Sequence, residues 1–276
     1  MELIQTTIKV GLDRPVNVLH ITDTHLPLCE KDDAARFVEA AARRGGADTT
    51  LSALDEQLAY ADAHCDLLLH TGDLIDFASK ANLAFLRRFL RNEKVLFAPG
   101  NHEYWRSDGG FEDMTYRMDS FSRMGGLGAD LFFTSRVVGG VNFVGIDDAY
   151  HQVEAWQTKR LQAEAEKGLP VVLFLHAPLF EQQLYDRSVA YWHDGTAYLL
   201  GCDDAHTAQY SDYGIRTQKP TEATKAFADY VNGEPGIKAV IAGHVHFNFE
   251  SRLPGGTMQY VTACSRSGAA RLLTLS

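Results

Sequence analysis

Short apolar runs with few polar interruptions recur along the chain, and turn-forming or charged residues separate them. Strands buried on both faces of a sheet have this nearly continuous apolar character, because neither face meets water. Their short length also favours strands over helices. The pattern predicts strands at Val16–Ile21, Asp66–His70, Lys94–Ala98, Val141–Ile146, Pro170–Leu175 and Ile237–Ala242.

Between several of these runs, apolar residues recur at steps of three and four, which is the spacing of an amphipathic helix. Residues that can cap a helix stand before these patterns, and glycine follows two of them. The predicted helices are Leu51–Cys65 behind an N-cap at Thr49 or Thr50, a helix through Leu83–Leu90 behind Ser79, one from Val153 to about Gly168, and one from Thr221 to Asn232-Gly233.

The last part of the chain changes character. His246–Leu253 and Thr257–Ala263 flank Pro254-Gly255-Gly256, which predicts a hairpin, and Arg271–Leu275 predicts a final strand. Early strands therefore alternate with helices, whereas late strands pair directly. This mixture predicts an α/β fold in which sheets pack together with helices outside. The least regular stretches are residues 109–128 and Phe180–Lys219.

Length and composition favour one domain over residues 1–276, since 276 residues with 45% hydrophobic content can bury a large core. The formal net charge is −10, and cationic runs do not exceed the pairs Arg43-Arg44 and Arg87-Arg88. A nucleic-acid surface needs clustered cations that displace counterions from phosphates. The composition therefore argues against a nucleic-acid partner.

The first residues carry no basic cluster ahead of an apolar stretch, so we expect no secretory signal. No apolar run is long enough to predict a transmembrane helix, and we expect no membrane partner. The cysteines Cys29, Cys65, Cys202 and Cys264 lie far apart without a CxxC pair, which suits free thiols in a reducing compartment. The sequence predicts a cytoplasmic protein and leaves its oligomeric state open.

Side chains of the kinds that bind metals follow the predicted strands directly. In open α/β sheets, ligands bind outside the carboxyl ends of the strands, so these side chains are expected to converge. One such motif occurs by chance, but five in succession indicate a shared site. The motifs contribute Asp23 and His25, Asp73 and Asp76, Asn101 and His102, His176, and His244 and His246.

The residue types suggest the chemistry. Two divalent ions about 3.5–4 Å apart can clamp a phosphoryl group and activate water, and they need a carboxylate between them. Imidazole together with carboxylate suits manganese, iron or zinc, whereas an all-oxygen shell favours magnesium or calcium. Gly72, Gly100 and Gly243 fit tight turns that bring the backbone close to such a site.

The complete set of motifs resembles the signature of the calcineurin-like metallophosphoesterase superfamily over residues 16 to about 263. The resemblance implies two mixed β-sheets packed face to face and flanked by helices, in four αββα layers. It also implies that Asp23, His25 and His246 hold the first metal ion, that Asn101, His176 and His244 hold the second, and that Asp73 bridges them. His102 would face the substrate and assist the leaving group. The motifs are Asp23-Thr24-His25, Gly72-Asp73-Leu74-Ile75-Asp76, Gly100-Asn101-His102-Glu103, His176 and Gly243-His244-Val245-His246.

Departures from the family pattern indicate which branch of the family the chain resembles. Purple acid phosphatases carry an iron-binding tyrosine where this chain has Asp76. Protein serine/threonine phosphatases carry Arg-Gly and His-Gly-Gly where this chain has Phe77-Ala78 and His176-Ala177-Pro178. The first two motifs look most like the branch of cyclic-nucleotide and glycerophosphodiester phosphodiesterases.

Simpler interpretations apply to other polar residues. His20 and His70 stand inside apolar runs and are interpreted as hydrogen-bonded core histidines. Asp76 and Glu103 are expected to orient or support the ligands rather than to bind metal. A further metal site among Cys202, Asp203, Asp204 and His206 has no supporting ligand spacing, and Asp147 and Asp148 could lie near the metals or form a turn.

The leading functional hypothesis is metal-dependent hydrolysis of a small-molecule phosphate ester, with a phosphodiester favoured by the branch resemblance. The alternatives are a nuclease or repair phosphodiesterase of the same superfamily and a non-catalytic scaffold. Phe180–Lys219 combines tyrosines, Trp192, Arg187 and Arg216, a composition too aromatic for a disordered linker. We expect this segment to form a cap that selects the organic part of the substrate, the alternative being a role in packing or in an oligomer interface.

Overall fold

The computed structural model describes residues 1–45, 47–104, 127, 131–193 and 195–276. Strands in this part form a five-stranded sheet of order β1-β11-β2-β3-β4 and a six-stranded sheet of order β5-β6-β7-β8-β10-β9, both containing parallel and antiparallel pairs. The strands are β1 (Glu2–Ile8), β2 (Val16–Ile21), β3 (Leu67–His70), β4 (Val95–Phe97), β5 (Phe133–Val138), β6 (Val141–Ile146), β7 (Val171–Phe174), β8 (Ile237–Ala242), β9 (Phe249–Arg252), β10 (Met258–Val261) and β11 (Ala269–Leu275).

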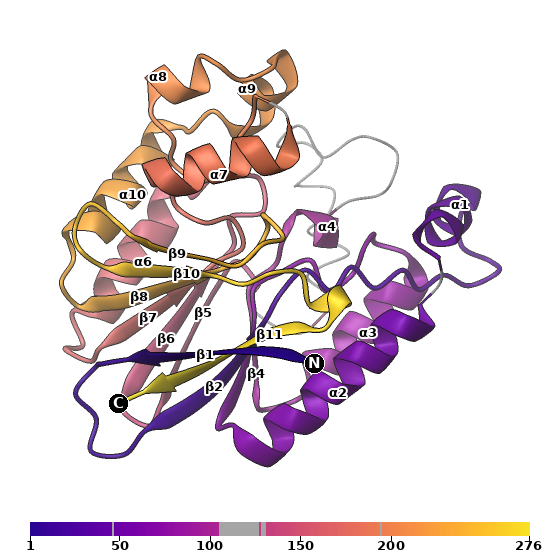
Figure 1. Cartoon of the computed structure of the whole chain (residues 1–276), viewed down its shortest axis with the longest axis horizontal. Coiled ribbons are helices and arrows are strands. Elements are labelled where there is room, and N and C mark those ends of the chain that lie inside the picture. Colours follow the sequence, from indigo (N-terminus) through magenta and orange to yellow (C-terminus); the bar gives the residue numbers. More distant parts are fainter. Residues whose placement is uncertain (46, 105–126, 128–130, 194) are drawn as a thin grey trace.

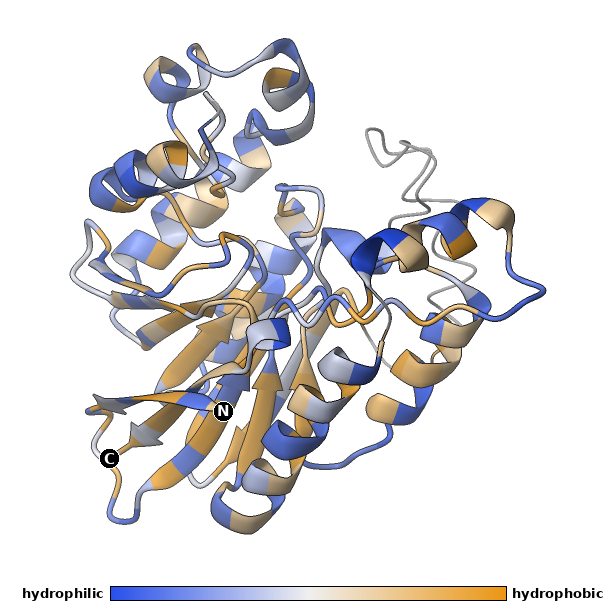
Figure 2. Cartoon of the chain, turned by 45° about the vertical axis from the view of Figure 1, so that its right-hand side comes forward, coloured by the Kyte–Doolittle hydropathy of each residue, from blue (hydrophilic) through white to orange (hydrophobic). Residues whose placement is uncertain are grey.

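Helices lie outside the two sheets, and the helices within residues 182–218 stand at one end of the molecule (Figure 1). Figure 2 shows the apolar residues concentrated on the strands between the helices. The helices are α1 (Ala35–Arg44), α2 (Asp48–His64), α3 (Lys80–Phe89), α4 (Asn101–Tyr104), α6 (Ala155–Ala165), α7 (Gln182–Trp192), α8 (Asp204–Thr207), α9 (Asp212–Gln218) and α10 (Glu222–Gly233), with a 3₁₀ turn at Ser265–Ser267.

The two sheets pack face to face through one shared cluster of buried side chains. Leu67 and Leu69 of β3 point into this cluster from the first sheet, and Val172 and Phe174 of β7 point into it from the second. The intervening residues on these strands face the helices instead, since successive side chains alternate between the two faces of a strand. Both faces are therefore buried, which explains the nearly continuous apolar runs in the sequence.

The outer layers complete the fold. Leu54 of α2 and Leu86 of α3 pack on the outer face of the first sheet. Leu161 of α6 and Phe227 of α10 cover the outer face of the second. This arrangement confirms the predicted α/β fold with two mixed sheets packed face to face and helices on both sides.

Local boundaries differ from the sequence prediction in several places. The helix α2 begins at Asp48 after Ala47, so Thr49 and Thr50 are not its N-cap, and Thr50 is buried within its first turn. Ser79 and Thr221 do cap α3 and α10, each accepting a backbone N–H through its hydroxyl. The strands β1 and β5 were not predicted, because both mix polar with apolar residues and most of their positions are only partly buried or exposed.

The segment Phe180–Lys219, called the cap segment from here on, folds into α7, α8 and α9. Leu184 and Tyr185 of α7 share a buried cluster with Val245 and Phe247, which flank His246. The cap segment is therefore packed against the chain that carries the last predicted site residues. Residues 109–128, which the sequence also marks as irregular, lie outside the described residues except for Leu127.

The four cysteines are all free, as the sequence indicates. Among the residues that the structure describes, no helix has the length and apolar character needed to cross a lipid bilayer.

Candidate metal centre

The predicted site residues gather where strands of both sheets end. The first sheet supplies the loops after β2, β3 and β4, and the second supplies the loops after β7 and β8 (Figure 1). The strand ends meet because the sheets are packed face to face with these loops at one edge. The side chains brought together are Asp23, His25, Asp73, Asp76, Asn101, His102, His176, His244 and His246.

Several of these residues have left-handed backbone conformations, which non-glycine residues adopt infrequently. Asp23, His25, Asp73, His244 and His246 all have φ between 48° and 67°. Such conformations cost roughly 1–3 kcal/mol each and concentrate at functional sites, where the surrounding structure holds them in place. These backbone conformations direct the side chains of each loop toward the common centre.

Gly72 and Gly100 allow the second and third loops to approach closely. A Cβ atom on Gly72 would lie 2.4 Å from the backbone nitrogen of Gly100 and 2.8 Å from Nδ1 of His176. Backbone atoms cannot yield to that contact, so a side chain at either glycine would push the two loops apart. The close approach expected from the sequence is present.

Asp23, His25 and His246 form the first group. Nε2 of His246 lies 3.2 Å from Oδ1 of Asp23 and 3.1 Å from Nε2 of His25. Oδ1 of Asp23 is buried and has no hydrogen-bond partner among the described residues. An acceptor without a donor, facing two imidazole nitrogens that also face each other, fits a cation bound between them.

Asp73, His176 and His244 form the second group, with Asn101 beside them. Nε2 of His176 lies 2.9 Å from Nδ1 of His244, 3.1 Å from Oδ1 of Asn101 and 3.4 Å from Oδ2 of Asp73. Four donor atoms of suitable chemistry thus face one small space. This set also fits a borderline divalent ion.

Asp73 lies between the two groups. Its Oδ2 atom is 3.4 Å from Nε2 of His176 in the second group and 3.8 Å from Nε2 of His25 in the first. Its Oδ1 atom accepts a hydrogen bond from the backbone N–H of His102 at 2.8 Å. The side chain is therefore anchored by one oxygen and presents the other to both groups.

Neighbouring polar groups orient these side chains. Nδ1 of His176 donates to the backbone carbonyl of Thr71 at 2.7 Å, which leaves Nε2 to face the centre. The backbone N–H groups of His176 and Ala177 both donate to the buried Asp148 carboxylate. Asp148 therefore supports the His176 loop, a role that the sequence alone could not separate from a turn. Such outer contacts hold metal-binding side chains in position.

Comparison with known proteins agrees with this arrangement. Residues 16–248 match the family model described as calcineurin-like phosphoesterase. The chain belongs to this family. It is a metal-dependent phosphoesterase, and the family implies a centre with two divalent ions.

Solved structures give weaker likenesses to this phosphoesterase. A dimetal phosphatase from Danio rerio is 14% identical with a TM-score of 0.49, over 91% of this chain and 88% of that one. A phosphopantetheinyl hydrolase from Mycobacterium tuberculosis is 13% identical with a TM-score of 0.43, over 94% and 91%. A 5′-nucleotidase from Candida albicans is 11% identical with a TM-score of 0.41, over 93% of this chain and 46% of that one. No curated protein matches the chain.

Asp76 lies beside the first group of the phosphoesterase and contacts two histidines. Its Oδ1 atom is 3.2 Å from Nδ1 of His25 and 3.3 Å from Nδ1 of His102. Its Oδ2 atom accepts from Nε of Arg44 at 2.8 Å. Nδ1 of His102 also donates to the backbone carbonyl of Asp76 at 2.8 Å. These contacts place Asp76 as a support for His25 and His102, with Arg44 balancing its charge.

Glu103 is buried and holds two loops together. Its carboxylate accepts backbone N–H groups from Asp73, Leu74 and Ile75 at 2.8–3.2 Å and from Gly100 at 2.6 Å. Burial, together with the nearby charge of Asp73, raises the pKa of Glu103 to about 7. The side chain points to backbone rather than to the two groups, which agrees with its expected structural role.

Charge in the centre favours ionised carboxylates beside imidazolium groups. Burial opposes ionisation of Asp73, but His176 and His102 outweigh it and hold the pKa of Asp73 well below its usual value. Burial likewise opposes charging of His102, yet Asp73 and Asp76 raise its pKa to about 9. Asp73 raises the pKa of His176 to about 10 against the same opposing burial. In the absence of bound cations, the acidic site thus attracts protons to its histidines.

His20 and His70 are core histidines with satisfied ring nitrogens, as interpreted from the sequence. His20 contacts the hydroxyls of Thr262 and Thr71, both at 2.8 Å. Nδ1 of His70 accepts from the backbone N–H of Gly72 at 3.2 Å, and Nε2 lies 3.0 Å from the hydroxyl of Thr24. Both are fully buried.

We expect His70 to make stability depend on pH. Burial lowers the pKa of His70 to about 3, whereas the unfolded chain retains a value near 6.5. A lowered folded-state pKa stabilises the protein fully above about pH 6.5, and this stabilisation is lost as pH falls toward 3. We therefore compare the unfolding free energy of the wild-type protein with that of His70→Gln. The amount by which the wild-type value exceeds the variant value should fall by about 2 kcal/mol between pH 6.5 and pH 5. Urea unfolding with a chelator present measures this difference.

The exposed His64 on α2 provides the control for this measurement. The difference between the wild-type protein and His64→Gln should not change over the same pH range. A difference for His70→Gln that stays constant from pH 7 to pH 5 would show that His70 titrates normally in the folded protein.

His151 was missed by the sequence prediction. It follows β6 through the turn that begins at Asp147, it is buried, and its Nε2 lies 2.9 Å from Nε2 of His244. Its backbone is left-handed with φ of 54°, like several residues of the centre. The signal that could have revealed it is its place just beyond a strand end, the same signal that identified the other histidines. His151 contacts the ring nitrogen of His244 that faces away from His176.

Replacing His151 by asparagine should weaken metal binding to the second group by roughly 10- to 100-fold, which is the usual effect of removing an outer contact to a ligand. Asparagine tolerates the left-handed backbone but is too short to reach His244. His151→Gln, which restores a side chain of similar reach, should recover part of the loss. Metal titration by calorimetry measures the effect.

His193 offers a matched control, since it is an exposed histidine with φ of 56° at the end of α7. His193→Asn should keep the metal affinity of the wild-type protein. Equal affinities for His151→Asn and the wild-type protein would mean that the contact with His244 does not support binding.

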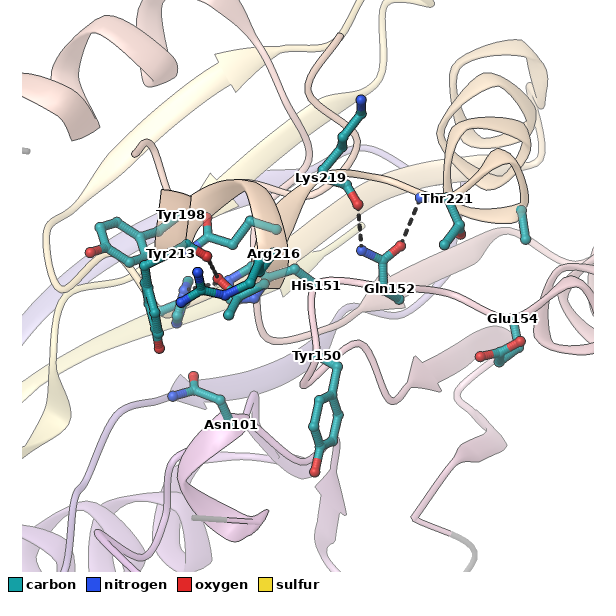
Figure 3. Close-up of a pocket in the computed structure, with 14 residues that line it drawn as sticks. Asn101, Tyr150, His151, Gln152, Glu154, Tyr198, Tyr213, Arg216, Lys219 and Thr221 are labelled. Carbon is teal, nitrogen blue, oxygen red and sulfur yellow. Dashed lines mark hydrogen bonds between the residues drawn. The ribbon is translucent and has the colours of Figure 1, made fainter. Parts of the chain in front are cut away.

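A cavity opens beside the second group. Its volume is about 490 Å³, and its lining includes Asn101 and His244 together with residues of the cap segment (Figure 3). Within the described residues, no cap-segment residue joins the clusters of metal-type side chains. His206 instead contacts Asp203 at 2.7 Å, and Cys202 accepts from the hydroxyl of Tyr210. The cap segment therefore borders the centre without extending it.

Proposed function

We propose that this phosphoesterase hydrolyses a phosphodiester of a small molecule, such as a cyclic nucleotide or a glycerophosphodiester, with two bound metal ions. The observation that carries the proposal is the convergence of two groups of donor atoms on either side of Asp73. Within each group, one candidate atom per residue lies within 4.8 Å of the others. The preference for a diester rests on the resemblance of the first two motifs.

We assign Asp23, His25 and His246 to the first ion and Asn101, His176 and His244 to the second, with Asp73 between them. Mixed imidazole and carboxylate ligands favour manganese, iron or zinc. When bound, the ions supply charge stabilisation and a water activated for attack on phosphorus. The protein side chains position these ions and exclude competing orientations of the phosphate.

We assign His102 the task of protonating the leaving oxygen. Its Nδ1 atom is engaged by Asp76, so we assign the opposite nitrogen, Nε2, to the substrate. Without bound cations, the carboxylates of Asp73 and Asp76 raise its pKa to about 9 despite burial, and the contact with Asp76 favours the protonated form of the ring. A group in that form can donate a proton as the ester bond breaks.

We further propose that the whole chain, residues 1–276, is one domain in which the cap segment selects the organic part of the substrate. The cap segment and the second group line the same cavity, which supports this role. Replacing the segment by a short linker would expose Val245 and Phe247 on either side of His246, because they pack against α7. Point substitutions in the cavity are therefore a better test than deletion.

Metal analysis combined with a hydrolysis panel tests the proposed function. The panel contains chromogenic mono- and diesters, cyclic nucleotides, a glycerophosphodiester and single-stranded DNA. Chelation should abolish hydrolysis of the small diesters, and added manganese should restore it best or nearly so. Full activity in metal-free protein would overturn the proposal, and a strong preference for DNA would favour the nuclease alternative. Metal binding without hydrolysis of any ester would indicate a scaffold.

A further inference from the structure

The cavity beside the second group has walls from several separate parts of the chain. Asn101 and Tyr150 form one side, and α9 of the cap segment forms the opposite side (Figure 3). Tyr198 also lines the cavity, and its ring centroid lies 6.0 Å from that of His244. The volume of about 490 Å³ falls in the range of roughly 300–1,000 Å³ typical of small-molecule sites. A phosphate held by the metal ions would therefore have its organic arm at this cavity.

Tyr213 and Arg216 reach into the cavity from α9. They are three residues apart, so they lie on the same face of the helix. Figure 3 shows both side chains on the wall across from Asn101. The tyrosine ring offers a flat surface to an organic group, and the guanidinium offers paired N–H donors.

Among the residues that the structure describes, no acidic side chain pairs with Arg216. Of the hydrogen bonds and ion pairs formed by the described residues, none involves its guanidinium. Lys219 also lines the cavity, but Figure 3 shows its ammonium group directed away, while its backbone carbonyl accepts from Gln152. Glu154 lies at the far end of the cavity from Asn101 (Figure 3). Arg216 is thus the cation of the lining nearest to the second group.

An arginine without an acidic partner among the described residues stands out in a chain with a formal net charge of −10. The reacting phosphate is accounted for by the proposed metal ligands, of which Asn101 and His244 border the cavity. A guanidinium is suited to planar, two-point recognition of carboxylate or phosphate oxygens. These facts point to an anion on the organic arm rather than to the phosphate that reacts.

We propose that the natural substrate carries a second anionic group, a carboxylate or a phosphate, on its organic arm, and that Arg216 binds this group in the cavity. The inference rests on the proposed phosphodiester hydrolysis and narrows its substrate class. Within the proposed class, it ranks diesters with an anionic organic arm above those whose organic part is neutral, such as simple glycerol esters and cyclic nucleotides. Arg216 then determines specificity through substrate binding.

The test uses two pairs of p-nitrophenyl phosphodiesters with the same leaving group. One pair has a benzyl arm with and without a para-carboxylate, and the other has a thymidine 5′-arm with and without a 3′-phosphate. The metal-loaded wild-type protein should hydrolyse the charged member of at least one pair with kcat/KM roughly tenfold higher or more, mainly through a lower KM, because a hydrogen-bonded charge pair contributes at least this factor. The pair that shows the effect identifies the anion.

Variants assign the preference to Arg216. In Arg216→Gln the ratio of kcat/KM between charged and neutral members should fall to about one, and Arg216→Lys should give an intermediate ratio, with metal content unchanged in both. Arg252→Gln is the control, because Arg252 is exposed on the hairpin strand β9 and contacts the carbonyl of Gly256. It should keep the wild-type ratio.

The outcomes separate the two proposals. Two results would overturn the role of Arg216. One is a wild-type protein whose kcat/KM is the same for the charged and the neutral ester in both pairs. The other is an Arg216→Gln protein that keeps the wild-type ratio of kcat/KM between the two esters. In either case hydrolysis of the neutral esters would still support the proposed function. Failure of the metal-loaded wild-type protein to hydrolyse any of the four esters would instead contradict the proposed function itself.

Discussion

The Asp73→Asn variant is expected to lose phosphodiester hydrolysis by roughly 10³-fold or more, together with affinity for both metal ions. Asp73 presents one oxygen to His25 and to His176, so its charge serves both groups. Each ion contributes several kcal/mol of charge stabilisation to the transition state, and every 1.36 kcal/mol changes the rate tenfold. Asparagine keeps the size of the side chain and removes the charge. Metal analysis by mass spectrometry and steady-state kinetics on a chromogenic diester measure both losses.

Asp33→Asn is the matched control for this substitution. Asp33 is also a buried carboxylate that accepts two backbone N–H groups, from Glu30 and Lys80, but it lies outside the clusters of metal-type side chains. It should retain two ions per chain. An Asp73→Asn protein that binds two ions with wild-type affinity would show that Asp73 does not bridge them. His246→Ala should chiefly empty the first group, which distinguishes a bridging ligand from a ligand of one ion.

The fold class followed from the sequence because both faces of the central strands are buried. Val172 and Phe174 face the other sheet while Val171 and Leu173 face the helices, so the run is apolar throughout. Such runs identify strands without an alignment. The motifs at their ends could be joined into one site because parallel strands bring their carboxyl ends to the same edge.

The features that escaped prediction depend on contacts between distant parts of the chain. The strand β1 is mostly exposed or partly buried at the edge of its sheet and pairs with β11 from the opposite end of the sequence. The support of Asp76 by Arg44 joins the second motif to α1, and no local pattern links them. His151 acts through His244, which lies 93 residues away. Propensity and spacing carry no information about such pairings.

The cap segment illustrates the same limit. Its aromatic composition predicted an ordered segment near the site, and α7, α8 and α9 are ordered there. Composition did not indicate which side chains would line a cavity. Arg187 lies over the rings of Tyr191 and Phe247, whereas Arg216 lines the cavity beside the second group. Only the packed structure distinguishes the two arginines.

The His102→Ala variant should retain both metal ions and lose turnover by roughly 10²–10⁴-fold, the range typical of a positioned proton donor. His102 contacts Asp76 through Nδ1, and its side chain is 18% exposed, so it can reach a substrate. Measured metal stoichiometry together with kcat tests this separation. His64→Ala removes an exposed histidine from α2 and should change neither quantity.

The nature of the leaving group gives the sharpest form of this prediction. A p-nitrophenolate leaves without a proton at neutral pH, whereas an alkoxide needs one as its bond to phosphorus breaks. The defect of His102→Ala should therefore be larger for alkyl esters than for p-nitrophenyl esters of the same phosphate. Equal defects for both would assign His102 to charge stabilisation instead. Loss of one ion per chain would place it among the ligands, since His102 also lies in a cluster with His25 and Asp76.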